Sequence, residues 1–340
     1  MSVGRAAYVT GGTGLLGSHL VERLVADGWG VRALVREGTD ASALVAQGVG
    51  VVRGDITQPA PALEPGMRGC SRVFHCAAFV DDWAPLAKML EVNVEGVRHV
   101  LEAAHSAGVA RVVHIGSLAV YGNGNQADLD ETSPFVETGD NYNHTKIACA
   151  RTVREVARAT GLDVVTLVPP YIYGPRDRQF FPRVCATLRD GGWVYIDRGE
   201  HPFTPVYVLH LVDACVRAAE CAEAAGESFI ITDGRSITRK RFVDILCEEL
   251  GYAPPKKSVP RWLARTLVPL FEGIARLVRA KQAPRLNTFR YKFLATRLTF
   301  DVSKARRVLG WSPAFDTEEA LRRTARWFRE NRPDLMPASS

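Results

Sequence analysis

The sequence lacks the cysteine patterns of a disulfide framework or a zinc site. Its seven cysteines are odd in number, several lie in apolar runs, and none belongs to a Cys-x-x-Cys motif. Disulfide-rich secreted domains and zinc sites both use paired, regularly spaced cysteines. We therefore expect reduced thiols, a cytoplasmic location and no metal site.

Membrane-crossing and targeting segments are also missing. No uncharged apolar run reaches the roughly 18 residues that a spanning helix needs. The opening residues, MSVGRAAYVTGG, lead almost directly into a strand and a glycine loop, so we expect no signal peptide. Low-complexity blocks and internal repeats are absent too, which argues against disordered tails and solenoids.

Positive charge is in excess, but it is not concentrated. The 43 Lys and Arg residues outnumber the 37 Asp and Glu residues, which gives a net charge of +6. A nucleic-acid-binding protein would gather its Lys and Arg into one stripe, whereas here they are spread, with a mild cluster between Arg261 and Lys304. We interpret this as a solvated basic surface and expect no nucleic-acid partner.

The first half of the chain alternates short β-branched runs with longer helical patterns, and the apolar content of 46% permits a sizeable core. Strands are predicted at 6–10, 30–35, 48–55, 71–78, 110–117 and 162–170, and helices at 15–28, 85–108 and 141–161. This alternation predicts parallel strands joined by right-handed helical crossovers. The fold class is therefore α/β, with a Rossmann-type, doubly wound parallel sheet.

After Pro169 the regular alternation of strands and helices ends, and loops and further helices follow. Late strands are predicted at 204–208 and 227–233, and helices near Pro182 and at 209–226, 238–251, 259–281 and 317–332. We predict that residues 1–168 form a dinucleotide-binding domain, to which 203–233 return. Residues 169–202 and 234–332 then form a smaller, mostly helical substrate lobe over the carboxyl edge of the sheet.

The segment TGGTGLLG follows the first predicted strand and opens the first predicted helix. It satisfies both Gly12-x-Gly14-x-x-Gly17 and Gly11-x-x-Gly14-x-x-Gly17. Glycines permit a tight turn and close backbone approach, and the helix N-terminus offers free N–H groups to a pyrophosphate. We predict dinucleotide contacts from Gly11, Thr13, Gly14, Leu15, Leu16 and Gly17.

The end of the second predicted strand bears on which dinucleotide binds. NAD enzymes usually place an acidic residue there for the ribose hydroxyls, but this chain has Val35 followed by Arg36. An arginine attracts a 2′-phosphate through charge-assisted hydrogen bonds, whereas a carboxylate would repel it. We therefore favour NADP(H), with NAD(H) as the alternative and a simple surface charge as the alternative role of Arg36.

The next two strand ends also suit a cofactor. Asp55, in the segment GDIT with Ile56, could accept a hydrogen bond from the adenine amino group or cap a turn. The segment HCAA ends the fourth predicted strand with Cys76, Ala77 and Ala78. Small side chains there would let the cofactor lie flat against the strand ends.

A Tyr-x-x-x-Lys spacing occurs twice. Tyr142 and Lys146 lie in a segment of helical periodicity, so they would share one helix face. Tyr252 and Lys256 enclose two prolines, which break a helix, so they would not share a face. A free tyrosine titrates near pH 10 and is a poor acid–base group at neutral pH, but a nearby ammonium favours the phenolate. Ser117 directly follows a predicted strand, at the sheet edge where ligands bind.

Over essentially its whole length the chain resembles an extended short-chain dehydrogenase/reductase. The motifs, in the family's order, are TGGTGLLG, GDIT, HCAA, NVEG, GSLAVYG, YNHTK and YIYGP. The resemblance implies that Tyr142 is the general acid/base, Lys146 its ribose-binding helper and Ser117 the donor to the substrate oxygen. Asn93 resembles a helix asparagine that orders the site and a proton-relay water, although an asparagine can also simply bridge a kink. Pro169, Tyr171 and Ile172 would lie beside the nicotinamide.

The substrate motifs resemble the 3β-hydroxysteroid dehydrogenase branch. Nucleotide-sugar members often carry an asparagine after the sixth strand and an arginine near the late strand, and LVPPYIYGP and HPFTPVYV lack both. The segments DDWAP and YIYGPRD, with VYVLHLVDA, instead resemble enzymes acting on sterols and 4-carboxysterols. The resemblance implies substrate contacts from Val80, Trp83, Ser117 and Tyr171, and a homodimer is a further expectation from the family.

The segment 259–281 has a broad apolar face. That face comprises Trp262, Leu263, Leu267, Leu270, Phe271, Ile274, Leu277 and Val278, with Arg261, Arg265, Arg276 and Arg279 around it. Such a helix could contact a membrane surface peripherally or cover an apolar pocket. The alternative is an ordinary helix packed on the core of its lobe.

We therefore predict reversible hydride transfer between NADP(H) and a secondary alcohol or ketone on a bulky apolar molecule, a sterol or steroid. Within enzymes, the alternatives are a nucleotide-sugar epimerase or dehydratase and a long-chain β-keto acid reductase. A cofactor-sensing protein without catalysis is the alternative from another class. The combination of Ser117, Tyr142 and Lys146 argues against it, because a sensor needs none of them together.

Overall fold

The computed structural model describes residues 5–81, 83–122, 124–278, 280, 284 and 287–337. Arg279 and Lys281, at the end of the predicted helix over 259–281, lie outside the described residues, and the side chain of Arg276 is not described. The remaining predicted site residues are all described.

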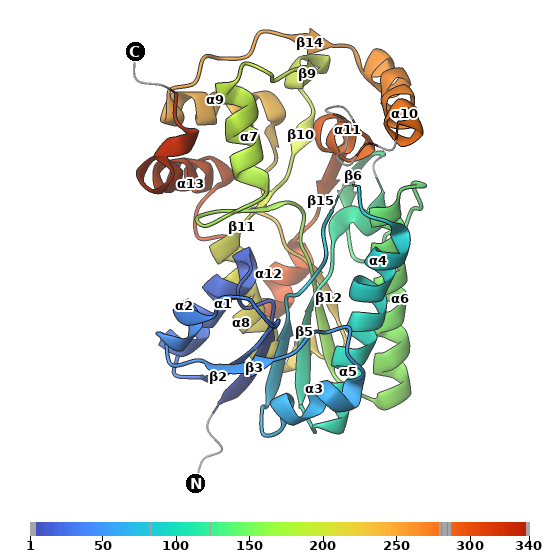
Figure 1. Cartoon of the computed structure of the whole chain (residues 1–340), viewed down its shortest axis with the longest axis vertical. Helices are drawn as coiled ribbons and strands as arrows, with labels where there is room; N and C mark the ends of the chain where they lie inside the picture. Colours follow the sequence, from blue (N-terminus) through green and yellow to red (C-terminus); the bar gives the residue numbers. More distant parts are fainter. Residues whose placement is uncertain are drawn as a thin grey trace.

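Seven parallel strands form one sheet, which confirms the Rossmann-type α/β fold (Figure 1). The strands are β1 (Ala6–Thr10), β2 (Gly30–Val35), β3 (Gly50–Arg53), β4 (Arg72–His75), β5 (Arg111–Ile115), β7 (Val164–Val168) and β12 (Ser228–Ile230), in the order β12-β7-β5-β4-β1-β2-β3. The central strands β1, β4, β5 and β7 are almost entirely buried, as strands covered on both faces of a parallel sheet are.

Helices cover both faces of the sheet. On one face α1 (Leu15–Ala26) packs against α8 (Val208–Glu220), and on the other α3 (Ala60–Met67), α5 (Gly96–Ser106) and α6 (Asn141–Thr160) pack in sequence. A short helix, α2 (Ser42–Val45), precedes β3. Each face has its own buried apolar cluster.

Two predicted helices differ from the structure. The helix predicted over 85–108 consists of α4 (Leu86–Leu90), a π-helical turn (Glu91–Glu95) and α5. The helix predicted over 209–226 ends at Glu220, and a short 3₁₀ turn (Ala222–Ala224) follows. The guanidinium of Arg111 donates to the carbonyl oxygens of Ala218 and Cys221, which fixes the end of that helix.

The later segments form a second layer above the carboxyl edge of the sheet (Figure 1). Its helices are α7 (Phe180–Arg189), α9 (Arg239–Leu250), α10 (Arg261–Leu277), α11 (Thr288–Ala295) and α13 (Thr317–Asn331). Short strands pair between them: β8 (Ile172–Tyr173) with β11 (Val206–Tyr207), β9 (Tyr195–Ile196) with β14 (Ser258–Val259), β10 (Pro202–Phe203) with β13 (Ile237–Thr238), and β6 (Asn125–Leu129) with β15 (Arg297–Phe300).

The second layer has a separate core, rich in aromatic side chains. The helix α12 (Ser303–Leu309) is different, because Ala305 and Leu309 belong to the sheet core and α12 packs against β12 and α8. The division of the chain at residues 169, 203 and 234 stays a prediction.

Asp233 lies buried between the sheet and this second layer, with 3% of its surface exposed. Its Oδ1 atom accepts hydrogen bonds from the backbone N–H of Tyr207 and from Nδ1 of His210, both at 2.8 Å. Its Oδ2 atom accepts from the hydroxyl of Tyr173, also at 2.8 Å. One carboxylate therefore joins β8, β11 and the start of α8.

We expect Asp233→Ala to lower the free energy of unfolding by about 3–5 kcal/mol, because three buried donors lose their acceptor. Urea denaturation followed by circular dichroism measures the change. Asp213→Ala is the matched control, since its carboxylate is 30% exposed and bound to Arg217; it should cost less than about 1 kcal/mol. Equal losses in the two variants would contradict the role assigned to Asp233.

Candidate active site

At two positions the glycine loop between β1 and α1 has no space for a Cβ atom. Gly11 has a φ of +72°, and a Cβ atom there would lie 2.8 Å from the backbone nitrogen of Ala77. A Cβ on Gly17 would lie 2.1 Å from the carbonyl oxygen of Gly11. The helix α1 begins at Leu15, after Gly14, so its first N–H groups face the loop uncapped by a side chain. This cradle fits the pyrophosphate of a dinucleotide.

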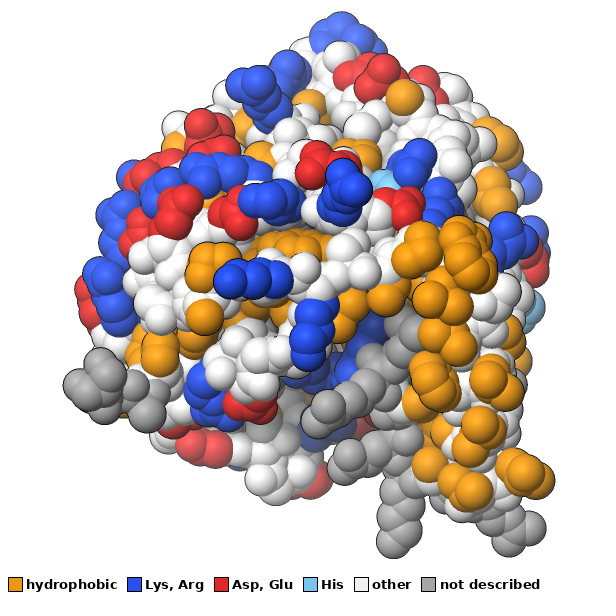
Figure 2. Space-filling model, turned by 90° about the horizontal axis from the view of Figure 1, so that it is seen from above, with side chains coloured by type: hydrophobic (Ala, Val, Ile, Leu, Met, Phe, Trp, Pro, Cys, Tyr) orange, Lys and Arg blue, Asp and Glu red, His pale blue; other side chains and the backbone are white. Residues whose placement is uncertain are grey.

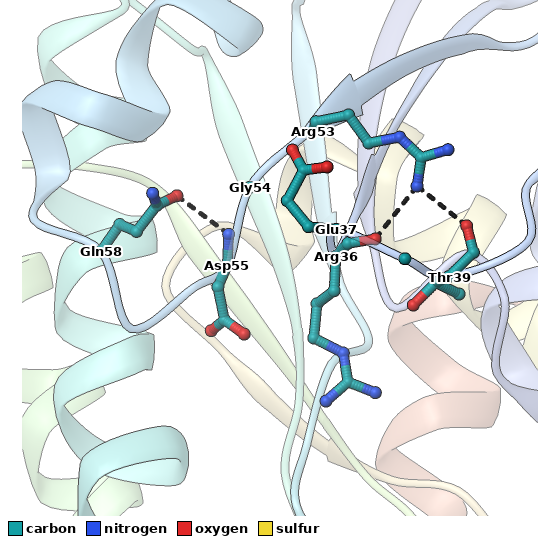
Figure 3. A pocket seen from close by; sticks show the side chains of 8 residues that line it. Arg36, Glu37, Thr39, Arg53, Gly54, Asp55 and Gln58 are labelled. Atoms are coloured by element: carbon teal, nitrogen blue, oxygen red, sulfur yellow. Dashed lines mark hydrogen bonds between the residues drawn. The ribbon is translucent and has the colours of Figure 1, made fainter.

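A polar cavity of about 550 Å³ lies at the ends of β2 and β3. It is lined by Arg36, Glu37, Gly38, Thr39, Arg53, Gly54, Asp55 and Gln58. Figure 3 shows the side chains of Arg36 and Asp55 extending in the same direction, and the carboxylate of Glu37 in the opposite one. Arg53 donates to the carbonyl oxygens of Arg36 and Thr39, so it holds the turn after β2.

Asp55 has the turn-capping role that the sequence left open. Its Oδ1 atom accepts from the backbone N–H and the hydroxyl of Thr57, both at 2.9 Å. Its neighbour Ile56 is buried and packs against Gly96 of α5. Asp55 also lines the cavity, so an adenine contact from this residue stays a prediction.

The ends of β1 and β4 are joined by hydrogen bonds beneath the glycine loop. The backbone N–H of Cys76 donates to the carbonyl oxygen of Thr10, and that of Ala77 donates to the Thr10 hydroxyl, both at 3.2 Å. This fixes the backbone of the predicted cofactor residues Cys76 and Ala77, which lead into Ala78, directly against Gly11.

Tyr142 and Lys146 lie one turn apart on α6. Lys146 is buried, with 5% of its surface exposed, and its Nζ atom is 5.7 Å from the centre of the Tyr142 ring. Asp140 caps the helix by accepting from the backbone N–H of Asn143 at 3.0 Å. By contrast, Tyr252 is buried elsewhere and donates to the carbonyl oxygen of Leu335, and the segment that leads from it to Lys256 is not helical.

Ser117 follows β5 and begins a 3₁₀ turn (Leu118–Tyr121). Its Oγ atom accepts from the backbone N–H of Ala119 at 3.2 Å. Asn143 joins this turn to α6, because its Nδ2 group donates to the carbonyl oxygens of Ala119 at 2.7 Å and Val136 at 3.0 Å. Ser117 and the Tyr142–Lys146 face are thereby held on neighbouring elements.

The segment from Pro169 to Ile172 connects β7 to the second layer. The carbonyl oxygen of Pro169 accepts from the backbone N–H of Leu118, and Ile172 pairs with Val206. The ring of Tyr171 stacks on Phe180 at 5.6 Å. Burial raises the pKa of Tyr171, the nearby charge of Arg239 opposes this rise, and negative charge on Tyr142 or Asp140 would add to it.

Val80 and Trp83 lie in the loop after β4. Val80 is 41% exposed, and the indole N–H of Trp83 donates to the carbonyl oxygen of Ala280 at 3.1 Å. The same loop is pinned by Asn93, whose Oδ1 accepts from the backbone N–H of Phe79 and whose Nδ2 donates to its carbonyl oxygen, both at 2.8 Å. Asn93 itself is buried in the π-helical turn.

Asp140, Asn143 and Lys292 also shape the site, and the sequence reasoning did not single them out. Lys292 of α11 forms an ion pair with Asp140, and although burial opposes it, this ammonium lowers the pKa of Asp140. An aspartate directly before a helical pattern is a capping signal that could have identified Asp140. Nothing local marks Lys292, which lies 152 residues away.

Comparison with known proteins identifies the family. Residues 7–232 match the NAD dependent epimerase/dehydratase family. A 4-hydroxy-2-methyl-3-oxo-4-farnesyl-3,4-dihydroquinoline-1-oxide ketoreductase from Stigmatella aurantiaca is 32% identical over 317 residues, which cover 92% of this chain and 94% of the relative. Sterol demethylase protein B from Methylococcus capsulatus is 32% identical over 329 residues, covering 95% of this chain and 98% of the relative.

A solved structure supports the same assignment. DesIV, a dTDP-glucose 4,6-dehydratase from Streptomyces venezuelae with NAD and TYD bound, matches with a TM-score of 0.77 and 27% identity. The match covers 96% of this chain and 98% of that one. The chain therefore belongs to the NAD-dependent epimerase/dehydratase family of extended short-chain dehydrogenases/reductases, and it is an NAD(P)-dependent oxidoreductase.

Proposed function

We propose that the protein catalyses reversible hydride transfer between a nicotinamide dinucleotide and a secondary alcohol or ketone of a bulky apolar substrate, of the sterol or steroid kind. The observation that carries this proposal is the pairing of Tyr142 with the buried ammonium of Lys146, 5.7 Å from its ring. Asn143 holds this pair against the turn that begins at Ser117.

Each polar group has a definite task in the proposed reaction. A bound nicotinamide dinucleotide supplies or accepts the hydride. In the reducing direction the hydroxyls of Ser117 and Tyr142 hold the carbonyl oxygen, and Tyr142 donates the proton. The positive charge of Lys146 stabilises the phenolate that remains. The glycine loop would hold the pyrophosphate, and Lys146 would bind the nicotinamide ribose.

An apolar substrate agrees with the second layer of the structure. Tyr171, Phe180, Phe203 and Phe293 pack ring against ring there. The buried guanidinium of Arg239 donates to the carbonyl oxygens of Pro202, Phe293 and Thr296. It is therefore already engaged, whereas a nucleotide-sugar enzyme needs a cation that is available to a diphosphate.

The names of two relatives point the same way, because a farnesylated ring system and a sterol are both bulky and apolar. The alternative is a nucleotide-sugar epimerase or dehydratase, as the name of DesIV would suggest. Tight binding of a nucleoside diphosphate to the second layer would favour this alternative.

We also propose a preference for NADP(H) over NAD(H). The support is the cavity at the end of β2, where Arg36 extends beside Asp55 and Glu37 points away (Figure 3). The preceding residue is Val35, so the usual ribose-binding carboxylate at that place is replaced by a guanidinium.

The helix α10 offers an apolar face for which we propose a membrane surface as the partner. Ala264, Val268 and Ala275 point into the protein and are buried. The outward-facing side chains are those of Trp262, Leu270, Phe271, Ile274 and Leu277, with Val278 directly after the helix, and they are between 40% and 84% exposed. Figure 2 shows these hydrophobic side chains gathered in a strip down one side of the molecule.

Charge and position favour an anionic bilayer over other partners for this strip. Arg265 is exposed on the same helix, and the chain carries a net charge of +6. The bond from Trp83 to Ala280 connects the end of the strip to the loop that carries Val80. An apolar substrate could then pass from lipid to the site. Within the described residues, every helix is too short or too polar to cross the bilayer, so this contact would be peripheral.

We expect Tyr142→Phe to lower turnover by about 10²–10⁴-fold, because the proton donor is lost. Cofactor affinity should stay within a few-fold, since the glycine loop is untouched. Sterol and other ketones, assayed by nicotinamide absorbance, give the rate, and fluorescence titration gives the affinity. Tyr252→Phe is the matched control and should retain turnover. Full activity of Tyr142→Phe would overturn the mechanism.

For the cofactor, Arg36→Asp should reverse the preference by weakening NADP(H) binding at least about tenfold relative to NAD(H), since a guanidinium–phosphate bond becomes a repulsion. Titration with both cofactors measures the ratio. Arg68→Asp, an exposed arginine paired with Glu64 on α3, serves as control. No preference in the wild type, or an unchanged ratio in Arg36→Asp, would contradict the proposal.

For the membrane contact, the protein should sediment with vesicles that contain phosphatidylserine and less with pure phosphatidylcholine. Replacing Leu270, Ile274 and Leu277 together by Glu should abolish sedimentation without loss of fold. Leu209→Glu, at another exposed leucine, is the control. A wild type that does not bind the vesicles would overturn the membrane contact. A wild-type dimer that the triple variant dissociates would instead assign the strip to a second copy of the chain.

A further inference from the structure

The turn after β2 carries hydrogen-bond donors that the described part of the chain leaves unused. The backbone N–H of Thr39 donates to the carbonyl oxygen of Arg36 at 3.1 Å, which closes a four-residue turn, and Gly38 has a φ of +73°. Among the described residues, the backbone N–H groups of Glu37 and Gly38 form no hydrogen bond. The same holds for the Thr39 hydroxyl and the guanidinium of Arg36. All four residues line the polar cavity of about 550 Å³, so these donors are available to an anion there.

Arg53 holds both ends of this turn. It is the last residue of β3 and pairs in register with Val35, the last residue of β2. Its Nη1 group donates to the carbonyl oxygen of Arg36 at 3.0 Å and to that of Thr39 at 2.8 Å (Figure 3). One guanidinium nitrogen on a strand of the sheet thus binds the first and the last residue of the turn.

Little else in the structure fixes the conformation of the turn. Residues 36–38 are exposed to solvent. Within the described chain, the two bonds from Arg53 are the only side-chain hydrogen bonds to residues 36–39. Asp40, which follows the turn, binds the backbone N–H of Ser42 at 2.9 Å instead. Since fixing the backbone of an exposed turn costs conformational entropy, this turn depends on Arg53 to keep one conformation.

The cavity also has positive charge on two of its sides. Arg36 and Arg53 both line it, and within the described residues neither guanidinium forms an ion pair with a carboxylate. Of the two carboxylates in the lining, that of Glu37 points away from Arg36 (Figure 3), and that of Asp55 accepts two hydrogen bonds from the residue two positions on. The lining therefore suits an anionic group.

The 2′-phosphate on the adenosine ribose is the only difference between NADP(H) and NAD(H). A phosphate monoester carries about two negative charges and binds most strongly to several directed, charged donors. Donors on a loose turn would have to be ordered first, and the entropy lost in ordering them would weaken binding. A turn that Arg53 already holds presents its donors without that cost.

We propose that Arg53 is a positioning residue for an adenosine 2′-phosphate. By binding both ends of the turn, it holds the guanidinium of Arg36 and the donors of residues 37–39 in place for a phosphate monoester. This rests on the preference for NADP(H) within the proposed function. It adds a second strand to that preference, because Arg36 follows β2 whereas the residue that fixes its turn belongs to β3.

Fluorescence titration with NADPH and NADH measures this role without any substrate. Arg53→Met removes the two hydrogen bonds and keeps a long side chain. We expect the variant to bind NADPH at least about tenfold more weakly and NADH within a few-fold of the wild type, because the 2′-phosphate is the group that the turn would hold. Adenosine 2′,5′-bisphosphate and 5′-AMP, used as competitors, should show the same difference. Arg68→Met, at an exposed arginine on α3, is the matched control and should change neither affinity.

A double-mutant cycle distinguishes positioning from direct binding. Arg36→Met alone should also weaken NADPH binding by at least about tenfold. If Arg53 acts through the turn that carries Arg36, the double variant should lose clearly less affinity than the product of the two single losses. Fully multiplicative losses would mean that Arg53 binds the phosphate independently, and they would overturn the positioning role.

Failure of the proposed function and failure of this role give different results. An enzyme that reduces no sterol or other ketone would overturn the proposed reaction, while both titrations would still test Arg53. Equal affinity of the wild type for NADPH and NADH would overturn the proposed preference and this role with it. A wild-type preference that Arg53→Met leaves unchanged would overturn the role of Arg53 alone. An equal loss of both cofactors in Arg53→Met would do the same, because a general structural role predicts it.

Discussion

The amide of Asn143 is the constraint on which the candidate site depends. It lies between Tyr142 and Lys146 in the sequence, yet it points away from solvent into the protein and bonds to three backbone groups, of Thr138, Ala119 and Val136. Those bonds fix both the rotation of α6 and the position of the turn after Ser117. If they were lost, Tyr142 and Lys146 would still share a helix face, but the hydrogen bonds that hold the first turn of α6 against the turn after β5 would be gone.

The sequence predicted the parts of this arrangement that depend on local patterns. The strands of the sheet are short, largely apolar runs between glycine or polar turns, so their alternation with helices, and hence the parallel sheet, could be predicted from the sequence. The π-helical turn at 91–95 was not, because one inserted residue barely changes the apolar periodicity. What selects that turn is the pair of bonds from Asn93 to Phe79, a contact across 14 residues. Likewise, the end of α8 is fixed by Arg111, which lies 107 residues from Ala218.

The distinction between local patterns and contacts across long stretches of sequence applies to the candidate site as well. The spacing of Tyr142 and Lys146 is a property of one helix, and the glycine loop is a property of one strand–helix junction. The bonds from Arg53 to the turn after β2 were not predicted, since Arg36 and Arg53 lie 17 residues apart and become neighbours only through sheet register. In the second layer, strand pairs such as β8 with β11 contain two residues each, which is too short for any period to be recognised.

The two layers act on the site as one body, because both reach the first turn of α6. Pro169 is bonded to Leu118 beside Ser117, and the chain that leaves it carries Tyr171 into the aromatic core of the second layer. That core includes Phe293 of α11, one residue after Lys292, which binds the capping carboxylate of Asp140. A substrate that displaced Tyr171 or α11 would therefore also disturb Asp140, the residue that caps α6, and α6 carries Tyr142. Substrate fit and the geometry of the proposed proton transfer are for this reason coupled through rigid contacts, and a poorly fitting substrate would lose rate as well as affinity.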